Sequence, residues 1–415
     1  MKPALLLFTD HFPYGTSEPF LSDELPYLSE AFATITIVPL DSSVHSVQRA
    51  IPENVNIFHS GITNYKNKIF LLGHGLFGKG SLKILLLDLV RSGAWRNIKK
   101  LIHWFTVALM IRSYLPVFNH LMKQTKNQQD TIAYFYWGQR WSQILPFIRH
   151  SFKKVIIRLH GSDLYEHLYQ DYIPFREQQL EFADRIFTIS ATGESYLKKK
   201  YPQLARKIHL ARLGSSDHGK NPESERQQNP FVVVSCAGLV KVKRIPLIPE
   251  ILKHTTNPIY WYHFGDGPQM KELKKKSMEL PKNITYNLMG HVNHEELLKF
   301  YATNHVDLFL NVSSSEGVPV SIMEALSFGI PVIATDVGGT GELIDETNGK
   351  LIPVDFSPLE TGKILNTMLP DDTLIERRIA ARRSWTKLAD SSLVYPEFIK
   401  HLMMDFQLHP QVNKR

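Results

Sequence analysis

The segment 313–344, "SSSEGVPVSIMEALSFGIPVIATDVGGTGELI", decides how the second half of this chain folds. It begins directly after one apolar run, "VDLFLNV" at 306–312, and contains a second, "IPVIATD" at 330–336. Between the two runs the pattern predicts a helix over 319–328, and Pro319 suits its first position because the N–H that proline lacks has no partner there. A strand, a helix and a second strand in this order predict one unit of a parallel sheet.

The same alternation of short apolar runs and helical segments extends along the whole chain. Because the runs are apolar throughout, they are typical of parallel strands whose two faces are both covered by helices. The sequence therefore predicts an α/β protein with two doubly wound, Rossmann-like domains. The other predicted strands are 4–8, 34–40, 131–137, 154–160 and 185–190 in the first half, and 230–238, 258–265 and 284–288 in the second.

A polar segment near the middle of the chain, "SDHGKNPESERQQNP" at 216–230, separates these two domains. It contains two prolines and almost no apolar residue, which is typical of a linker. We predict a first Rossmann-like domain over 1–218, a linker over 219–229, a second domain over 230–385 and a helical tail over 386–415.

The composition is that of a globular protein, with 43% hydrophobic and 21% charged residues among 415. The single cysteine, Cys236, excludes an intrachain disulfide and a cysteine-based metal cluster, and it favours a reducing, cytoplasmic setting. The most apolar long window, 101–118, is interrupted by His103 and Arg112, so we do not expect it to span a membrane. No zinc-finger, RRM or helix-turn-helix signature indicates a nucleic-acid partner.

The positive charge is concentrated between residues 61 and 126. Eleven basic residues there face one acid, Asp88, which gives the segment a charge of +10 within a chain whose net charge is +8. Aromatic and aliphatic residues alternate with the basic ones, as in amphipathic helices that lie on anionic membranes. A pair of core helices with a solvated basic face explains the same pattern, and the sequence leaves both interpretations open.

Two glutamates, Glu316 and Glu324, lie on either side of the predicted helix start. Glu316 could interact with the helix dipole, but Glu324 is too far along the helix to cap it. Gly317 allows a ligand to approach the backbone, and the amides at the helix start suit a phosphate. Because carboxylates accept hydrogen bonds from hydroxyls, this arrangement predicts a sugar-nucleotide site.

The segment 313–344 resembles the Glu-x7-Glu signature of retaining glycosyltransferases of family 4. The resemblance implies the GT-B fold, in which two Rossmann-like domains face a cleft and a C-terminal helix crosses back to the N-terminal domain. It also implies that Glu316 contacts the donor sugar and that Glu324 holds the ribose of the nucleotide. The backbone positions that it places near the donor are Gly317, Val318, Pro319, Val320, Gly338 and Gly339.

Other segments resemble the same family in the same order. The strand end "RLHGSDLY" at 158–165 resembles its His-Gly motif, and "CAGLVKVKRI" at 236–245 resembles its diphosphate-binding loop, with Gly238 where many members have arginine. The N-terminal loop and "YFYWGQRWS" at 134–142 resemble the branch that builds bacterial capsule, exopolysaccharide and lipopolysaccharide. The residues implied are His160 and Asp163 near the transferred sugar, Lys243 and Arg244 at the diphosphate, Gly15 in the first strand–helix loop, and Gly265 and Gly267 at the base.

The predicted activity is retaining transfer of a hexose-type sugar from a UDP- or GDP-sugar to a hydroxyl of a saccharide or lipid-linked acceptor (EC 2.4). Catalysis is assigned to His160, Lys243, Arg244 and Glu316. The chain contains no Asp-x-Asp, so no metal or other cofactor is expected. The implied location is cytoplasmic and peripheral, with segment 61–126 on the inner face of the cytoplasmic membrane.

Two alternatives remain. A catalytically silent GT-B protein could act as a scaffold in a polysaccharide assembly complex. A nicotinamide-dependent sugar enzyme would need Gly-x-Gly-x-x-Gly after the first strand, and "LLLFTDHFPYG" does not contain it.

Overall fold

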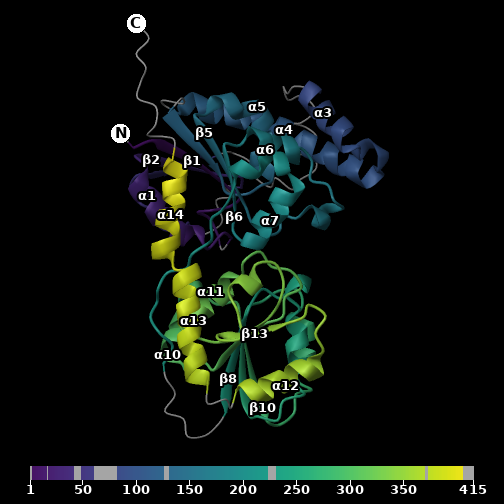
Figure 1. Ribbon diagram of the computed structural model, residues 1–415, viewed down its shortest axis with the longest axis vertical. Coiled ribbons are helices and arrows are strands. Elements are labelled where there is room, and N and C mark those ends of the chain that lie inside the picture. The colour runs from purple at the N-terminus through teal and green to yellow at the C-terminus, as the bar shows by residue number, and fades with distance from the viewer. Residues whose placement is uncertain are drawn as a thin grey trace. The chain divides into compact units, whose positions relative to one another are not determined.

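The chain forms two compact units in a computed structural model that describes residues 2–15, 17–41, 48–59, 82–125, 130–222, 230–369 and 373–404 (Figure 1). Unit 1 comprises residues 1–211 and 395–415, and unit 2 comprises residues 212–394. Each unit is a parallel sheet with helices packed against it, which confirms the predicted fold class.

The sheet of unit 1 has seven strands in the order β3-β2-β1-β4-β5-β6-β7. Strands β1 and β4 are neighbours in the sheet but not in the sequence, and the direction of the winding reverses between them. Such a switch point leaves a crevice at the carboxyl ends of the two strands, where ligands bind in folds of this kind. The strands are β1 Ala4–Thr9, β2 Thr34–Pro39, β3 Val55–Ile57, β4 Thr131–Phe135, β5 Lys154–Leu159, β6 Arg185–Thr188 and β7 Ile208–Leu210.

Alternate side chains of these strands fill apolar cores on opposite faces of the sheet. Leu6 and Phe8 belong to one core, together with residues of α4 (Ile98–Gln124) and α5 (Leu145–Ile148). Leu5 and Leu7 belong to the other, together with α1 (Leu21–Ala31) and Phe398 of α14 (Ser391–Met403). The end of the chain therefore returns to unit 1, where α14 lies near α1 (Figure 1). The remaining helices of this unit are α3 Leu82–Ser92, α6 Arg176–Phe182 and α7 Ala191–Lys200.

A fully buried ion pair lies beside this second core. Arg158 of β5 donates from Nη1 to Oε2 of Glu24 at 2.6 Å, and the hydroxyl of Tyr134 donates to Oε1 of Glu24 at 3.0 Å. The guanidinium carbon of Arg158 is 4.6 Å from the centre of the Phe398 ring. The last helix therefore covers a charged group that needs all of its partners inside the protein.

Helix α4 combines a buried part with an exposed part. Ten of its residues between Val107 and Met122 are buried in unit 1, whereas Ile98, Ile102 and Phe105 near its start are exposed. In the described part of the chain, it alone is long and apolar enough to cross a membrane by length and composition, and 44% of its most apolar window is buried.

The sheet of unit 2 has six parallel strands in the order β10-β9-β8-β11-β12-β13, and its switch point lies between β8 and β11. One of its cores contains Trp261, Leu310 and Ile333, all completely buried or nearly so. The strands are β8 Phe231–Cys236, β9 Ile259–Phe264, β10 Ile284–Gly290, β11 Leu308–Asn311, β12 Val332–Thr335 and β13 Gly349–Ile352. The helices are α8 Ile248–Leu252, α9 Met270–Ser277, α10 His294–Thr303, α11 Val320–Ser327, α12 Pro358–Met368 and α13 Leu374–Leu388.

The division of the chain differs from the predicted one at both boundaries. Unit 2 begins at Arg212, so the part of the predicted linker that the structure describes, 219–222, belongs to unit 2. Asn221 explains why, because its side-chain amide donates to the carbonyls of Tyr301 and Asn304 at 2.6 and 2.8 Å. Residues 223–229 lie outside the described residues. Of the predicted tail, 386–394 also belongs to unit 2, and only the chain from Tyr395 onward belongs to unit 1.

Candidate functional site

Two of the predicted catalytic residues of unit 2 meet at its switch point. Lys243 follows β8 and Glu316 follows β11. The ammonium of Lys243 donates to both oxygens of Glu316, at 2.6 and 2.8 Å. The carboxylate is nearly buried, with 8% of its side chain exposed, whereas the lysine is 29% exposed. A partly accessible cation is thus held in place by a carboxylate behind it.

Backbone contacts fix the loops that carry this pair. The amide of Ser314 donates to the carbonyl of Val242 at 2.8 Å, which joins the loop after β11 to the loop after β8. The amide of Gly339 donates to the carbonyl of Gly317 at 2.6 Å. Gly338 has a φ of +57°, and a Cβ at this position would lie 1.9 Å from the carbonyl oxygen of Glu316. Only glycine can bring the 338–339 turn so close to the loop that holds Glu316.

Arg244, which was predicted to bind the diphosphate, contacts main-chain carbonyl groups in this structure. Its backbone is left-handed, with a φ of +51°. The side chain turns beneath the loop, where Nε and Nη1 each donate to a carbonyl, of Val312 and Val354, at 2.7 Å. Its Nη2 donates to the carbonyl of Ser313 at 3.2 Å. In this structure Arg244 fastens the loop after β11, because its guanidinium is engaged with main-chain oxygens.

The predicted base-binding loop packs against the loop after β8. Gly265 and Gly267 have φ values of +142° and +153°, and a Cβ on them would lie 2.0 Å from the carbonyl oxygen of Ala237 and 2.8 Å from that of Leu239, respectively. A Cβ on Gly238 would meet nothing closer than 3.9 Å. The loop 265–268 therefore needs both of its glycines to approach its neighbour, whereas Gly238 stands in open space.

Helix α11 begins one residue later than predicted. Val320 is its first residue, and Pro319 precedes it as the cap residue with extended backbone. Gly317 and Val318 are partly exposed in the loop before this helix, and Val320 is partly exposed at its start. Glu324 is buried on its inner side, and its Oε1 lies 2.6 Å from Nε2 of His294, a residue that the sequence did not single out.

In unit 1, His160 lies beyond the carboxyl end of β5 and is surrounded by aromatic rings. The ring centres of Trp137, Tyr136 and Phe20 are 4.3, 4.7 and 5.8 Å from that of the imidazole. Both ring nitrogens are buried, and neither has a hydrogen-bond partner among the described residues. Burial lowers the pKa of His160, so the ring is neutral at pH 7. A buried, neutral imidazole with two unsatisfied nitrogens can bind a ligand hydroxyl as donor or acceptor.

Asp163 holds the backbone around this histidine. Its carboxylate accepts from the amides of His160 and Gly138, at 2.7 and 2.6 Å. Burial by itself would raise the pKa of Asp163, but the neighbouring imidazole of His160, the amide of Gly138 and the charge of Arg176 lower it, so the carboxylate is ionised. Its nearest oxygen is 3.9 Å from Nδ1 of His160, beyond hydrogen-bonding distance. Asp163 therefore acts on the main chain of the site.

The first strand–helix loop is organised by Glu18, which the sequence analysis did not select. Its carboxylate accepts from the amides of Asp10, His11 and Phe12 at 2.7 to 3.0 Å, and from Nε1 of Trp137 at 2.6 Å. Gly15 lies in the same loop with a φ of +66°. An acid in the loop after the first strand was a visible signal, but its amide partners depend on a turn that sequence patterns do not specify.

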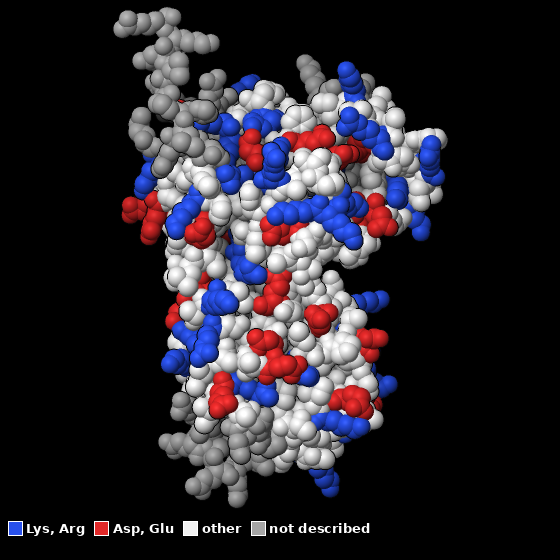
Figure 2. Space-filling model, viewed as in Figure 1, with Lys and Arg blue, Asp and Glu red and all other residues white. Residues whose placement is uncertain are grey.

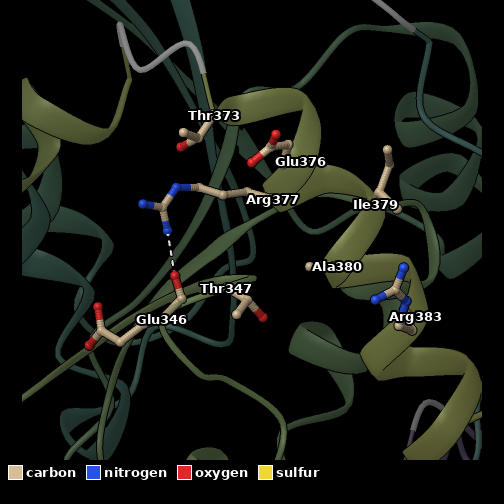
Figure 3. A pocket seen from close by; sticks show the side chains of 8 residues that line it. All are labelled: Glu346, Thr347, Thr373, Glu376, Arg377, Ile379, Ala380 and Arg383. Atoms are coloured by element: carbon tan, nitrogen blue, oxygen red, sulfur yellow. Dashed lines mark hydrogen bonds between the residues drawn. The ribbon is translucent and has the colours of Figure 1, made fainter.

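Two hollows in unit 2 lie at different edges of its sheet. The one in Figure 3, of about 520 Å³, is lined by α13 and by the loop before β13, where Arg377 donates to the carbonyl of Glu346 at 2.8 Å. This loop is at the opposite edge from Lys243 and Glu316. The other, of about 1380 Å³, includes Val240 and Pro268 and adjoins the predicted base-binding loop.

The structure describes no group of three or more His, Cys, Asp or Glu side chains that could hold a metal ion.

Burial, followed by the nearby charge of Glu324, raises the pKa of Cys236 to about 12. This thiol therefore stays protonated at the end of β8 and is not a nucleophile at neutral pH.

Two parallel sheets, each with a switch point, and a C-terminal helix that returns to unit 1 define a GT-B protein. Solved structures with the same fold include the lipopolysaccharide outer core galactosyltransferase WaaB, with a TM-score of 0.68 and 15% identity over 96% of this chain and 99% of WaaB. Another is HepE of Anabaena in complex with UDP, with a TM-score of 0.63 and 16% identity over 96% of this chain and 99% of HepE.

Residues 218–385, which make up most of unit 2, match the family described as glycosyl transferases group 1. A relative, the O-antigen biosynthesis glycosyltransferase WbnH of Escherichia coli, is 36% identical over 170 residues. That match covers 41% of this chain and 46% of the relative, so it spans about half of each protein. These findings confirm the predicted family and fold.

Proposed function

We propose that the protein transfers a sugar from a nucleoside diphosphate sugar to a hydroxyl of a saccharide or lipid-linked acceptor in cell-surface polysaccharide biosynthesis, with retention of anomeric configuration. The observation that carries this proposal is the Lys243–Glu316 pair at the switch point of unit 2. The proposal is also supported by the O-antigen role in the name of WbnH and by the UDP bound to HepE. We favour a UDP- or GDP-sugar as the donor and a metal-independent reaction.

The proposed division of labour follows from the hydrogen-bonding capacity of each group. An ammonium has three donors, and Glu316 occupies two of those of Lys243, so one remains for the diphosphate. A carboxylate has about four acceptor positions, so Glu316 can still accept from sugar hydroxyls. Lys243 and the amides at the start of α11 would then stabilise the charge that develops on the leaving group.

Retention would follow from attack on the face of the sugar from which the diphosphate departs. The bond between the anomeric carbon and the phosphate oxygen breaks as the acceptor oxygen bonds to that carbon. The acceptor proton passes to the departing phosphate. In this scheme Glu316 binds the sugar, and His160 contacts the transferred sugar from unit 1.

Ligand binding and product analysis test this proposal. A calorimetric screen of UDP-, GDP-, ADP- and CMP-sugars should identify one preferred donor. We expect Glu324→Ala to weaken binding of the free nucleotide itself, and Glu316→Ala to leave that binding largely intact while turnover falls. An inverted product anomer, determined by NMR, would contradict the retaining mechanism.

The alternative of a silent scaffold makes a different prediction. It requires no release of nucleotide when the protein and its donor are incubated with cell membranes that contain acceptor. The retained Lys243–Glu316 pair favours the enzyme, because a scaffold has no need of an accessible cation held at a switch point.

We further propose that unit 1 docks on an anionic membrane through α3, the 3-10 turn Ala94–Arg96 and the first turns of α4, here called the docking surface. Its apolar side chains stand out from the protein, with Val90 68%, Trp95 54%, Ile98 67% and Ile102 59% exposed. Apolar residues at this exposure next to basic ones suit the boundary between lipid headgroups and acyl chains. The segment 60–81 lies outside the described residues.

The charges of the docking surface support an anionic partner. Asp88, the single acid of segment 61–126, is buried and accepts from the hydroxyl of Tyr172 at 2.5 Å and from the amide of Phe175 at 3.0 Å. The exposed charges on these elements are therefore basic, and Figure 2 shows blue side chains among white surface around the place where Figure 1 labels α3. They are Lys83, Arg91, Arg96 and Lys99.

Liposome co-sedimentation with and without anionic lipid tests this docking. We expect the wild type to sediment with anionic vesicles, and replacement of Ile98 and Ile102 by serine to abolish most of that binding. Ile375 and Ile379 of α13 provide a matched control, because they have the same spacing and are 69% and 57% exposed. Equal recovery with both kinds of vesicle, or equal loss in both serine pairs, would contradict the proposal.

A further inference from the structure

The carboxylate of Glu324 is held from one side only. It is the fifth residue of α11 and is buried, with 9% of its side chain exposed. Its Oε1 lies 2.6 Å from Nε2 of His294, whereas its Oε2 accepts from no described residue. Since the pKa of Cys236 is raised in part by Glu324, the carboxylate lies near the end of β8, at the switch point of unit 2. One oxygen is therefore fixed, and the other is left for a ligand.

His294 comes from a different and well-anchored element. It is the first residue of α10, directly after Asn293, which forms a capping box with Glu296. Because a carboxylate oxygen can only accept, Nε2 of His294 must carry the proton in this contact. The imidazole is 48% exposed, whereas the side chain of Glu324 is only 9% exposed.

The energetic reason for such a contact is preorganisation. A glutamate side chain has three rotatable bonds, and immobilising it on binding has an entropic cost. If the carboxylate is already oriented in the free protein, a ligand hydroxyl does not have to supply that free energy. The gain applies only to ligands that donate a hydroxyl to Glu324.

We infer that His294 is a positioning residue that orients Glu324 toward the ribose of the donor, and that it thereby sets the preference for ribonucleotides over 2′-deoxyribonucleotides. The inference rests on the proposed function. A contact that merely ties α10 to α11 would stabilise the fold without any regard to the hydroxyls of the ligand.

Calorimetric titration of UDP, GDP and ADP, each compared with its 2′-deoxy analogue, separates the two roles. We expect the wild type to bind the tightest ribonucleotide about tenfold better than its deoxy analogue, as befits one hydrogen bond to a charged group. In His294→Leu the ribonucleotide should weaken about tenfold, and the deoxy analogue by less than about twofold, because the latter cannot use the oriented oxygen. His294→Gln, whose amide can donate from a similar position, should restore most of the preference.

The control is His254→Leu, an exposed histidine at the opposite edge of the same sheet, which should change neither affinity. If His294→Leu weakens both nucleotides equally, or if His294→Gln does not recover the preference, the contact is structural and the inference is wrong. If the wild type binds none of the three nucleotides, the proposed function itself fails, and the inference falls with it. Melting temperatures of all variants identify any that are unfolded. If His294→Leu is unfolded, the comparison of His294→Gln with the wild type decides alone.

Discussion

The carboxyl edges of the two sheets use opposite chemistry. In unit 2 the edge has an ion pair, Lys243 with Glu316, and loops that approach each other through glycines such as Gly338. In unit 1 the edge has a neutral histidine, His160, enclosed by the rings of Trp137, Tyr136 and Phe20. The same fold thus presents fixed charge and main chain on one sheet, and aromatic surface with two unsatisfied nitrogens on the other.

This difference indicates what each edge can recognise. Fixed charges and oriented amides suit a ligand with a constant, charged part, such as a diphosphate. An apolar pocket with a few polar atoms orients a largely uncharged group. If the proposed function is correct, mutations of the residues at the unit 2 edge that contact the nucleotide should weaken nucleotide binding. Mutations at the unit 1 edge should lower turnover and leave nucleotide binding unchanged.

The largest effect is expected for Lys243→Met. The change removes a cation from the proposed leaving-group site and leaves Glu316 buried without its partner, so turnover should fall about 1000-fold, equivalent to about 4 kcal/mol. Nucleotide release in the presence of cell membranes measures it. The control is Lys253→Met, whose ion pairs with Glu250 and Glu279 lie on the surface. A loss of turnover of less than tenfold would show that the Lys243–Glu316 ion pair is not what distinguishes the unit 2 edge.

The second largest effect is expected in the pH dependence of stability. It involves His263, which lies in β9 of unit 2. Burial lowers the pKa of His263 from 6.5 to about 4. As the pH falls from about 6.5 to about 4, the unfolded chain gains a proton on this residue that the folded chain does not, so stability decreases by about 3 kcal/mol. Urea unfolding between pH 4 and 7 measures this decrease, and His263→Asn should reduce it. If the free energy of unfolding changed with pH equally in the wild type and in His263→Asn, the decrease would not come from His263.

Third, His160→Phe should distinguish the role of the unit 1 edge from that of the unit 2 edge. Phenylalanine fits an aromatic surrounding but has no nitrogens, so we expect turnover to fall about 100-fold while nucleotide affinity changes by less than about twofold. His209→Phe is the matched control, since His209 also packs against aromatic rings in unit 1, those of Phe187 and His401. Weaker nucleotide binding in His160→Phe would show that the edges do not divide the work in this way.

The smallest effect is expected for Gly338→Ala. The added Cβ would lie 1.9 Å from the carbonyl oxygen of Glu316, so the loop must move, and nucleotide affinity should drop about tenfold. Gly93→Ala tests backbone strain alone, because Gly93 has a similar φ of +64° and open space around it. If the two variants bind nucleotide equally well, the close approach of the loops is not needed for binding.

Much of the fold could be read from the sequence because strands that are apolar throughout are unambiguous in a parallel sheet. All ten predicted strands are present, and three short edge strands, β3, β7 and β13, were missed. These have three or four residues and lie at the ends of the sheets, so they lack the long apolar run that identifies a central strand.

The candidate site was only partly accessible to the same reasoning. The motifs indicated that Lys243 and Glu316 lie at strand ends, which the switch point then brings together. The carbonyl contacts of Arg244, the amide contacts of Glu18 and the pairing of His294 with Glu324 were not predictable. Each depends on the backbone of a single turn or on the relative phase of two helices, and neither is encoded in residue spacing.

The return of α14 to unit 1 makes unit 2 an insertion within unit 1 in the order of the chain. Two connections result, and they are joined by hydrogen bonds of Ser215 with Ala389 and Ser391, at 2.9 and 3.1 Å. A fragment that ends at residue 211 would lack the Phe398 ring that covers Arg158, as well as the Leu402 carbonyl that accepts from Lys154. Unit 1 is therefore expected to fold separately only if the segment from 391 onward is joined to it, whereas unit 2 is one continuous piece of chain.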